Sequence, residues 1–165
     1  MVTKYHPEIF PVISGTNNAT NNVRDINGAG YDGQWIDLSK SEGGAYLIQV
    51  GNAGATAAVT IEQSTTAAAS GEKTVVWTER YSAADTSAAQ TLVKTTVSSN
   101  TFNIAASNGQ THMIPIRASQ LDTANDFRYV RLRIADPGSA TLVSVSFIPA
   151  LPMTFGDGAH QKYGE

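Results

Sequence analysis

Histidine is the residue type in this chain best suited to metal binding or acid–base catalysis, because imidazole titrates near neutral pH and ligates metals. The chain has three histidines, His6, His112 and His160, which are far apart in the sequence. None has a partner at the spacing of a metal-ligand motif. We therefore interpret all three as ordinary polar side chains, and we expect no metal and no other cofactor.

A glycine-rich string is the strongest candidate for a cation site. Gly28, Gly30 and Asp32 form a Gly-x-Gly-x-Asp pattern, which is similar to half of a calcium-binding nonapeptide repeat. Those sites need tandem copies because successive turns share each ion, and this chain has one copy. We interpret the string as a glycine loop. A weak contact of Asp25 and Asp32 with a cation stays open.

Covalent and general acid–base catalysis require side chains in defined arrangements, and the sequence offers none that we recognise. There is no cysteine and no Gly-x-Ser-x-Gly elbow. Asp122 and Asp126 flank a predicted helical turn, where aspartate commonly caps a backbone N–H. Asn18 begins a formal glycosylation sequon, which matters only in a host that glycosylates secreted proteins. We expect that the protein is not an enzyme.

One strand pattern predicts a surface that contacts a partner. In the segment 127–135, the alternation places Phe127, Tyr129, Arg131 and Arg133 on one face. Arginine and tyrosine are enriched at protein interfaces, and a basic aromatic face could also stack sugars or bases. The alternative is a solvated sheet face on which arginine stems cover apolar surface.

The two tryptophans, Trp35 and Trp77, lie in predicted strands. Tryptophan in a sheet protein commonly fills the space between two sheets, so we expect both in the core. A platform that binds sugars is the alternative.

Short alternating apolar segments, separated by turn residues, must position all of these side chains. Such regular spacing is typical of an all-β sandwich or barrel. We predict an antiparallel β-sandwich of jelly-roll type with eight or nine strands and one short helical turn at 118–122. Two pairs of segments are expected to form hairpins, 45–50 with 56–63 and 92–97 with 102–105. The predicted strands are 34–38, 45–50, 56–63, 73–81, 92–97, 102–105, 112–117, 127–135 and 140–149.

The ends of the chain differ from its middle. Residues 1–33 contain the apolar patch around Ile9 and Phe10, followed by a segment rich in Asn and Gly. We interpret 1–33 as an arm that docks on its own sandwich or on a neighbour, through contacts that include Ile9 and Phe10. The predicted sandwich spans 34–150, and residues 151–165 form a Gly-rich tail.

The composition of the chain argues against nucleic acid and membrane as partners. The chain has 165 residues, of which 15% are charged, and its net charge is −3. An acidic chain lacks the basic face that nucleic acid requires, so we expect no nucleic-acid partner. The sequence has no apolar run of about 18 residues and no apolar stretch after Met1–Pro7 of the kind a secretory signal has. We therefore expect no membrane span and no such signal.

Four segments together resemble a known family, the capsid decoration or cement proteins of tailed bacteriophages. Residues 35–40 (WIDLSK) and 45–51 (AYLIQVG) correspond to its first strands. Residues 59–64 (VTIEQS) and 129–134 (YVRLRI) correspond to a middle and a late strand. The resemblance covers about 34–150 and is one of strand sequences, with no match in the arm or the tail.

This resemblance implies a structural virion protein on the outer surface of an icosahedral capsid. Its partners would be the major capsid protein and itself, as a homodimer or homotrimer at a lattice symmetry axis. The family has no catalytic residues to carry over. A carbohydrate-binding sandwich module, or another phage component of the tail, neck or fibre, is the alternative.

Overall fold

Two antiparallel β-sheets make up the described part of the protein. The structure is a computed structural model, and it describes residues 13–14, 23–83 and 91–150. Within these ranges the helical content is two short 3₁₀ turns, Ala118–Gln120 and Thr123–Asn125. The first of these is the predicted helical turn. No helix in the described ranges is long and apolar enough to cross a membrane.

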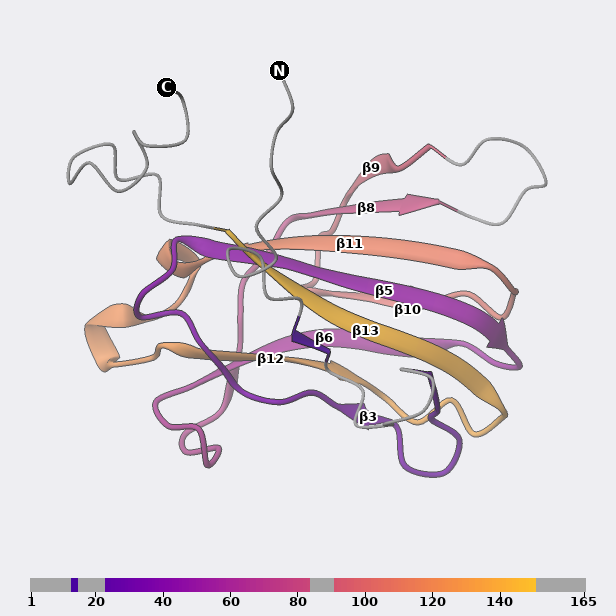
Figure 1. Cartoon of the computed structure of the whole chain (residues 1–165), viewed down its shortest axis with the longest axis horizontal. Helices are drawn as coiled ribbons and strands as arrows, with labels where there is room; N and C mark the ends of the chain where they lie inside the picture. The colour runs from indigo at the N-terminus through magenta and orange to yellow at the C-terminus, as the bar shows by residue number, and fades with distance from the viewer. Residues whose placement is uncertain (1–12, 15–22, 84–90, 151–165) are drawn as a thin grey trace, which may run out of the picture.

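The larger sheet, which we call sheet A, has seven strands. Its order is β1-β13-β5-β11-β8-β9, with β2 also paired to β13. The three longest strands, β13, β5 and β11, lie side by side at its centre (Figure 1). Its strands are β1 (Ile13–Ser14), β2 (Arg24–Asp25), β5 (Gly43–Ala53), β8 (Glu79–Ala83), β9 (Val93–Thr96), β11 (Gln110–Arg117) and β13 (Thr141–Ala150).

The smaller sheet, sheet B, has six strands. Its order is β10-β6-β12-β3, with β4 paired to β12 and β7 paired to β6. Both sheets together give thirteen strands in the described residues, five of which have two residues. The strands of sheet B are β3 (Tyr31–Asp32), β4 (Ile36–Asp37), β6 (Ala57–Ser64), β7 (Lys73–Thr74), β10 (Thr101–Ile104) and β12 (Tyr129–Ile134).

The core lies between the sheets, because alternate residues of each long strand point inward. Ile48 and Ile114 from sheet A and Leu132 from sheet B are fully buried in one hydrophobic cluster. Trp77 joins this cluster edge-on to Phe102, with ring centroids 6.1 Å apart. Burying a large apolar side chain contributes roughly 1.5–3 kcal/mol, so this shared cluster is what joins the two layers.

Both predicted hairpins are wrong, because each turn carries the chain from one sheet to the other. β5 pairs with β11 and β13, whereas β6, which follows it in sequence, pairs with β10, β12 and β7. Likewise β9 pairs with β8 in sheet A, and β10 pairs with β6 in sheet B. Alternation fixes which face of a strand is buried, but it does not fix the neighbouring strand.

The predicted strand 73–81 is two strands. β7 pairs with β6 in sheet B and β8 pairs with β11 in sheet A, so the residues between them cross the edge of the sandwich. Val75 and Trp77 are buried during this crossing, while Val76 is 63% exposed. The alternation of buried and exposed side chains over residues 75–77 is therefore the same as in a continuous strand. The indole N–H of Trp77 donates to the carbonyl of Asn100, 3.0 Å away, which fixes the crossing against the turn before β10.

The predicted boundary of the arm at residue 33 is too late. Ile26 and Tyr31 are buried in the core, and β2 and β3 pair with β13 and β12. Residues 24–33 therefore belong to the sandwich. The predicted contact residues Ile9 and Phe10 and the predicted tail 151–165 lie outside the described residues.

Candidate interaction face

The outward face of sheet B contains the predicted arginine stripe. Tyr129, Arg131 and Arg133 point outward from β12, while Val130, Leu132 and Ile134 point into the core. This part of the predicted alternation is confirmed. The neighbouring outward residue on β6 is Glu62, which lies opposite Arg131 in the strand register. We call the set Asp32, Trp35, Glu62, Glu72, Arg131 and Arg133 the ion-pair face.

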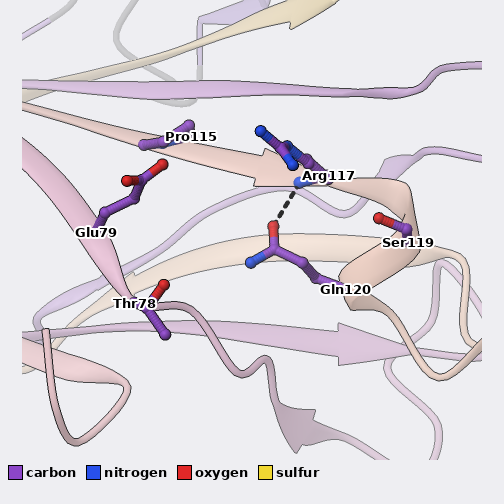
Figure 2. Close-up of a pocket in the computed structure, with 6 residues that line it drawn as sticks. All are labelled: Thr78, Glu79, Pro115, Arg117, Ser119 and Gln120. Atoms are coloured by element: carbon purple, nitrogen blue, oxygen red, sulfur yellow. Dashed lines mark hydrogen bonds between the residues drawn. The ribbon is translucent and has the colours of Figure 1, made fainter. Parts of the chain in front are cut away.

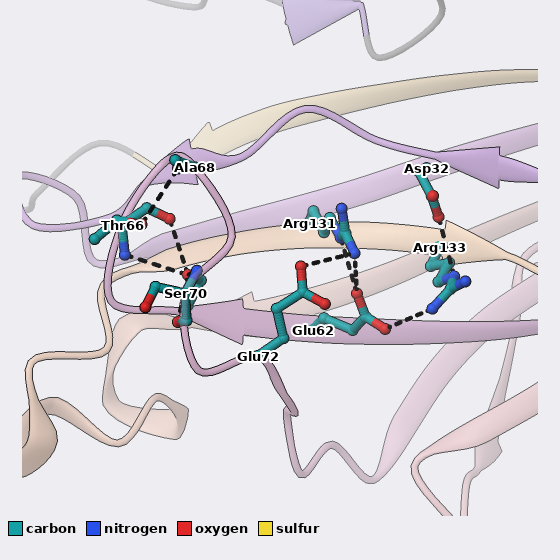
Figure 3. Close-up of polar contacts among 9 residues, drawn as sticks. Asp32, Glu62, Thr66, Ala68, Ser70, Glu72, Arg131 and Arg133 are labelled. Carbon is teal, nitrogen blue, oxygen red and sulfur yellow. Dashed lines mark hydrogen bonds and ion pairs between the residues drawn. The ribbon is translucent and has the colours of Figure 1, made fainter.

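Arg131 is the centre of the ion-pair face (Figure 3). Its Nε and Nη2 both lie 2.8 Å from Oε2 of Glu62, and its Nη2 lies 3.0 Å from Oε1 of Glu72. The side chains of Arg131 and Glu62 are each 14% exposed. The guanidinium also lies over the ring of Trp35, 4.6 Å from its centroid. The charge of Arg131 is thus satisfied within the chain and shielded from solvent.

Arg133 lies at one end of the ion-pair face, next to Asp32. Its Nε lies 3.0 Å from Oδ1 of Asp32, and its Nη1 lies 3.3 Å from Oε1 of Glu62. The charge of Asp32 and the hydrogen bond to Glu62 raise the pKa of the guanidinium. Half of the side chain remains exposed. Asp32, which the sequence offered as a cation ligand, is therefore the partner of an arginine.

A buried serine holds the loop that brings Glu72 to Arg131. Ser64 is fully buried at the end of β6, and its Oγ accepts from the backbone N–H of Thr66 and Ser70. The same hydroxyl lies 2.9 Å from the carbonyls of both residues. This network folds the loop back toward the sheet, as Figure 3 shows for Thr66, Ser70 and Glu72.

Phe127 is not part of the outward stripe, contrary to the prediction. It is 9% exposed, and the ammonium of Lys73 lies over its ring at 4.1 Å from the centroid. The preceding Asp126 has φ of 60°, in the left-handed region, so the alternation starts only after this turn. Arg128 is exposed instead and lies over the ring of Tyr129, 5.2 Å from the centroid.

The two tryptophans have different environments. Trp77 is 1% exposed and belongs to the core, as predicted. Trp35 is half-buried beneath Arg131 on the ion-pair face, so its predicted core position is wrong. The neighbouring Ile36 and Leu38 pack inward, and this leaves Trp35, just before β4, on the outer side of sheet B.

Two of the other carboxylates that the sequence singled out, Asp25 and Asp122, have structural partners, and Asp122 does not cap the 3₁₀ turn that follows it. Asp25 accepts the backbone N–H of Asn27 and of Thr141, each at 3.1 Å, and these bonds lower the pKa of its carboxyl group. Asp122 pairs with the ammonium of Lys73 and accepts from the side-chain amide of Asn125. Within the described ranges, no group of three or more histidine or acidic side chains could hold a metal ion.

A cavity of about 250 Å³ opens between β8 and the end of β11 (Figure 2). Two of the polar side chains that line it, Gln120 and Glu79, have partners within the chain. Gln120 accepts the backbone N–H of Arg117 at 2.6 Å and donates to the carbonyl of Val76 at 3.2 Å. Glu79 pairs with Lys94. These two side chains therefore support the fold.

The outward face of sheet A is apolar at its centre, which sequence reasoning missed. Met113 lies between Tyr81 and Leu47 in the strand register, and Ala45 lies between Pro115 and Ile148. All six are half-buried. We call them the apolar face. The signal was present, because the segments 45–50, 112–117 and 140–149 carry apolar residues in both phases of the alternation.

Comparison with known proteins gave no match: no family model, no curated protein and no solved structure is significantly similar to this chain.

Proposed function

We propose that this chain is a capsid decoration protein, a structural virion protein that binds the outer surface of a major capsid protein lattice. The observation that carries the proposal is the difference between the outward faces of the two sheets. The charged groups of the ion-pair face are paired with one another within the chain. The apolar face has neighbouring apolar side chains on four strands of sheet A, β8, β11, β5 and β13.

A rigid sandwich with these two faces suits attachment to a protein surface. The apolar face would dock on the capsid subunit, because burial of apolar surface is the main source of association free energy. The ion-pair face would then point to solvent. Tyr129 and the exposed half of Arg133 keep the predicted stripe available as a second contact. Ile9 and Phe10 remain predicted contacts of the arm.

Many weak contacts suffice for such a protein. A homodimer or homotrimer bound at a lattice symmetry axis engages several capsid subunits at once, and this raises the effective concentration of each contact. We also assign the sandwich to the jelly-roll type on the resemblance of its strand sequences to those of decoration proteins.

Binding to capsids that lack this chain tests the proposal. The purified protein should sediment with such capsids, and Met113→Glu should abolish this because it places a charge at the centre of the apolar face. Thr60→Glu introduces the same charge on the outward side of β6, in the opposite sheet, and serves as the matched control. Equal binding of both variants would contradict the proposed docking face, and failure of the unmodified protein to bind would contradict the function.

Carbohydrate binding is the second candidate, and the position of Trp35 favours it. The indole ring lies on an outward face with Arg131 over one side of it, beside the carboxylates Glu62 and Glu72. A sugar would stack on the part of the ring that Arg131 leaves uncovered, with the carboxylates as hydrogen-bond acceptors for its hydroxyl groups. Quenching of Trp35 fluorescence by a polysaccharide, lost in Trp35→Phe, would support this alternative. An unchanged spectrum would exclude Trp35 as the platform.

A further inference from the structure

His112 is a buried histidine with one unsatisfied ring nitrogen. It points inward from β11 and is 4% exposed. Its Nδ1 lies 3.1 Å from Nη1 of Arg80, whereas its Nε2 is buried without a hydrogen-bond partner. A buried polar atom that lacks a partner costs about 1–3 kcal/mol, so such an atom calls for a physical explanation.

The contact with Arg80 determines which nitrogen of His112 carries the proton. A guanidinium has donors and no acceptor, so Nδ1 must accept this hydrogen bond. The neutral ring therefore has its proton on Nε2. Burial, together with the nearby charge of Arg80, lowers the pKa of His112 to about 4 and keeps the ring neutral at pH 7. The unsatisfied atom is consequently a hydrogen-bond donor that lacks an acceptor.

Arg80 is a second group of this region that lacks a carboxylate partner. Its guanidinium lies over the ring of Phe102, 4.3 Å from the centroid, and this contact fixes its plane. The ion pairs of the described residues involve Lys73, Lys94, Arg131 and Arg133, and none involves Arg80. Arg80 thus retains a positive charge and free N–H donors in a partly desolvated position.

Arg80 and His112 line the same pocket, which has a volume of about 170 Å³. Ser82 on β8 and Asn103 on β10 also line it. Gln110 forms part of the wall, but its amide group is committed to the backbone of Ala105 and Ser107. Since a water molecule occupies about 30 Å³, the pocket is large enough for a small polar group and a few waters.

We propose that this pocket, between β8, β10 and β11, binds a carboxylate group, which accepts hydrogen bonds from the guanidinium of Arg80 and from Nε2–H of His112. A carboxylate supplies the acceptors that both donors lack, and its single negative charge matches the single charge of Arg80. A phosphate dianion would leave excess negative charge at a partly buried site, which is costly. The inference does not depend on the proposed capsid function.

Acetate is the probe for the test, with NMR detection of the His112 ring nitrogens at pH 7. Sodium acetate replaces sodium chloride at constant ionic strength, and His112→Gln assigns the signals. We expect a saturable shift of Nε2. A blocked Gly-Glu-Gly peptide, which carries one carboxylate, distinguishes a protein side chain from a free small acid as the source.

Two variants decide the result. Arg80→Gln should weaken acetate binding by more than about tenfold, because it removes the charge-assisted hydrogen bonds. Asn103→Asp should weaken acetate binding by a similar factor, because it places a second negative charge beside the acetate. Asn103 is exposed on β10, so this variant should fold even if Arg80→Gln does not. Ser99→Asp has the same charge change outside the pocket and should bind normally. Absence of a saturable shift, equal binding by all variants, or tighter binding of inorganic phosphate would overturn the proposal.

Discussion

Glu62 and Arg131 form a shielded ion pair at the centre of sheet B, with Nε of the arginine 2.8 Å from Oε2 of the glutamate. Glu62 also accepts from Arg133, so a single carboxylate binds two guanidinium groups. Glu62→Gln should lower the free energy of unfolding by about 2 kcal/mol, since the shielded Arg131 then keeps only the more exposed Glu72 as its anionic partner. Urea denaturation measures this effect.

The matched control for Glu62 is Glu72→Gln, which removes the more exposed partner of Arg131. An exposed ion pair contributes little, so this change should cost less than about 1 kcal/mol. Equal effects of the two substitutions would show that the shielded partner of Arg131, Glu62, stabilises the protein no more than the exposed partner, Glu72.

Two glycines test whether residues 24–33 are part of the sandwich. A Cβ at Gly30, where φ is +66°, would lie 2.6 Å from the carbonyl oxygen of Ile134, and the backbone there cannot move without disturbing β12. Gly30→Ala should therefore destabilise the protein by about 3 kcal/mol or more. Gly28 has φ of +81° but open space around it, so Gly28→Ala should cost about 1–2 kcal/mol. Thermal unfolding of both variants measures the difference. If residues 24–33 were a separate arm, both substitutions would leave stability unchanged.

The sequence predicts strands well where one face is uniformly apolar. The inward set Val130, Leu132 and Ile134 is an example, and it also places Arg131 and Arg133 outward. The pattern fails at Phe127, because the left-handed turn at Asp126 changes the phase. Such a backbone change has no signal in hydrophobic periodicity.

Other features depend on contacts between distant segments, which a single sequence does not reveal. Ile26 and Tyr31 lie in a segment dominated by Asn and Gly, so their burial follows from pairing with β13 and β12. The meeting of Arg80 with His112 likewise follows from the pairing of β8 with β11. Local pattern gives the faces of strands, but not this long-range register.

His112 predicts a specific dependence of stability on pH. Its pKa is about 4 in the folded state and about 6.5 in an unfolded chain. Above pH 6.5 the ring is neutral in the folded and in the unfolded state, so His112 does not reduce the free energy of unfolding. Between pH 6.5 and about 4 only the unfolded state gains the proton, so the free energy of unfolding falls by about 1.4 kcal/mol per pH unit, or about 3 kcal/mol in all.

Urea denaturation of the protein and of His112→Gln, in a buffer without carboxylates, measures this slope. The variant should lack it between pH 6.5 and 4.5. Asp25, Asp37 and Asp122 have lowered pKa values, so the stability they contribute is lost at lower pH. Parallel curves for the protein and the variant over this window would refute the assignment of the slope to His112.

The apolar face predicts self-association or lattice binding through sheet A. Leu47→Lys should disrupt this contact without unfolding the protein, because the side chain points away from the core. Sedimentation velocity would compare its oligomeric state with that of the unmodified chain, and circular dichroism would verify the fold. Thr60→Lys on the outward side of β6 is the control and should leave association unchanged. A monomer that binds no capsid would remove the basis for this face.

The copy number of this chain in purified virus particles tests the central proposal most directly. Quantitative mass spectrometry of intact particles would compare it with the major capsid protein. A decoration protein should be present in amounts comparable to the major capsid protein and should be released before the shell dissociates. A few copies per particle would indicate a tail, neck or fibre component instead, and absence from particles would contradict the account.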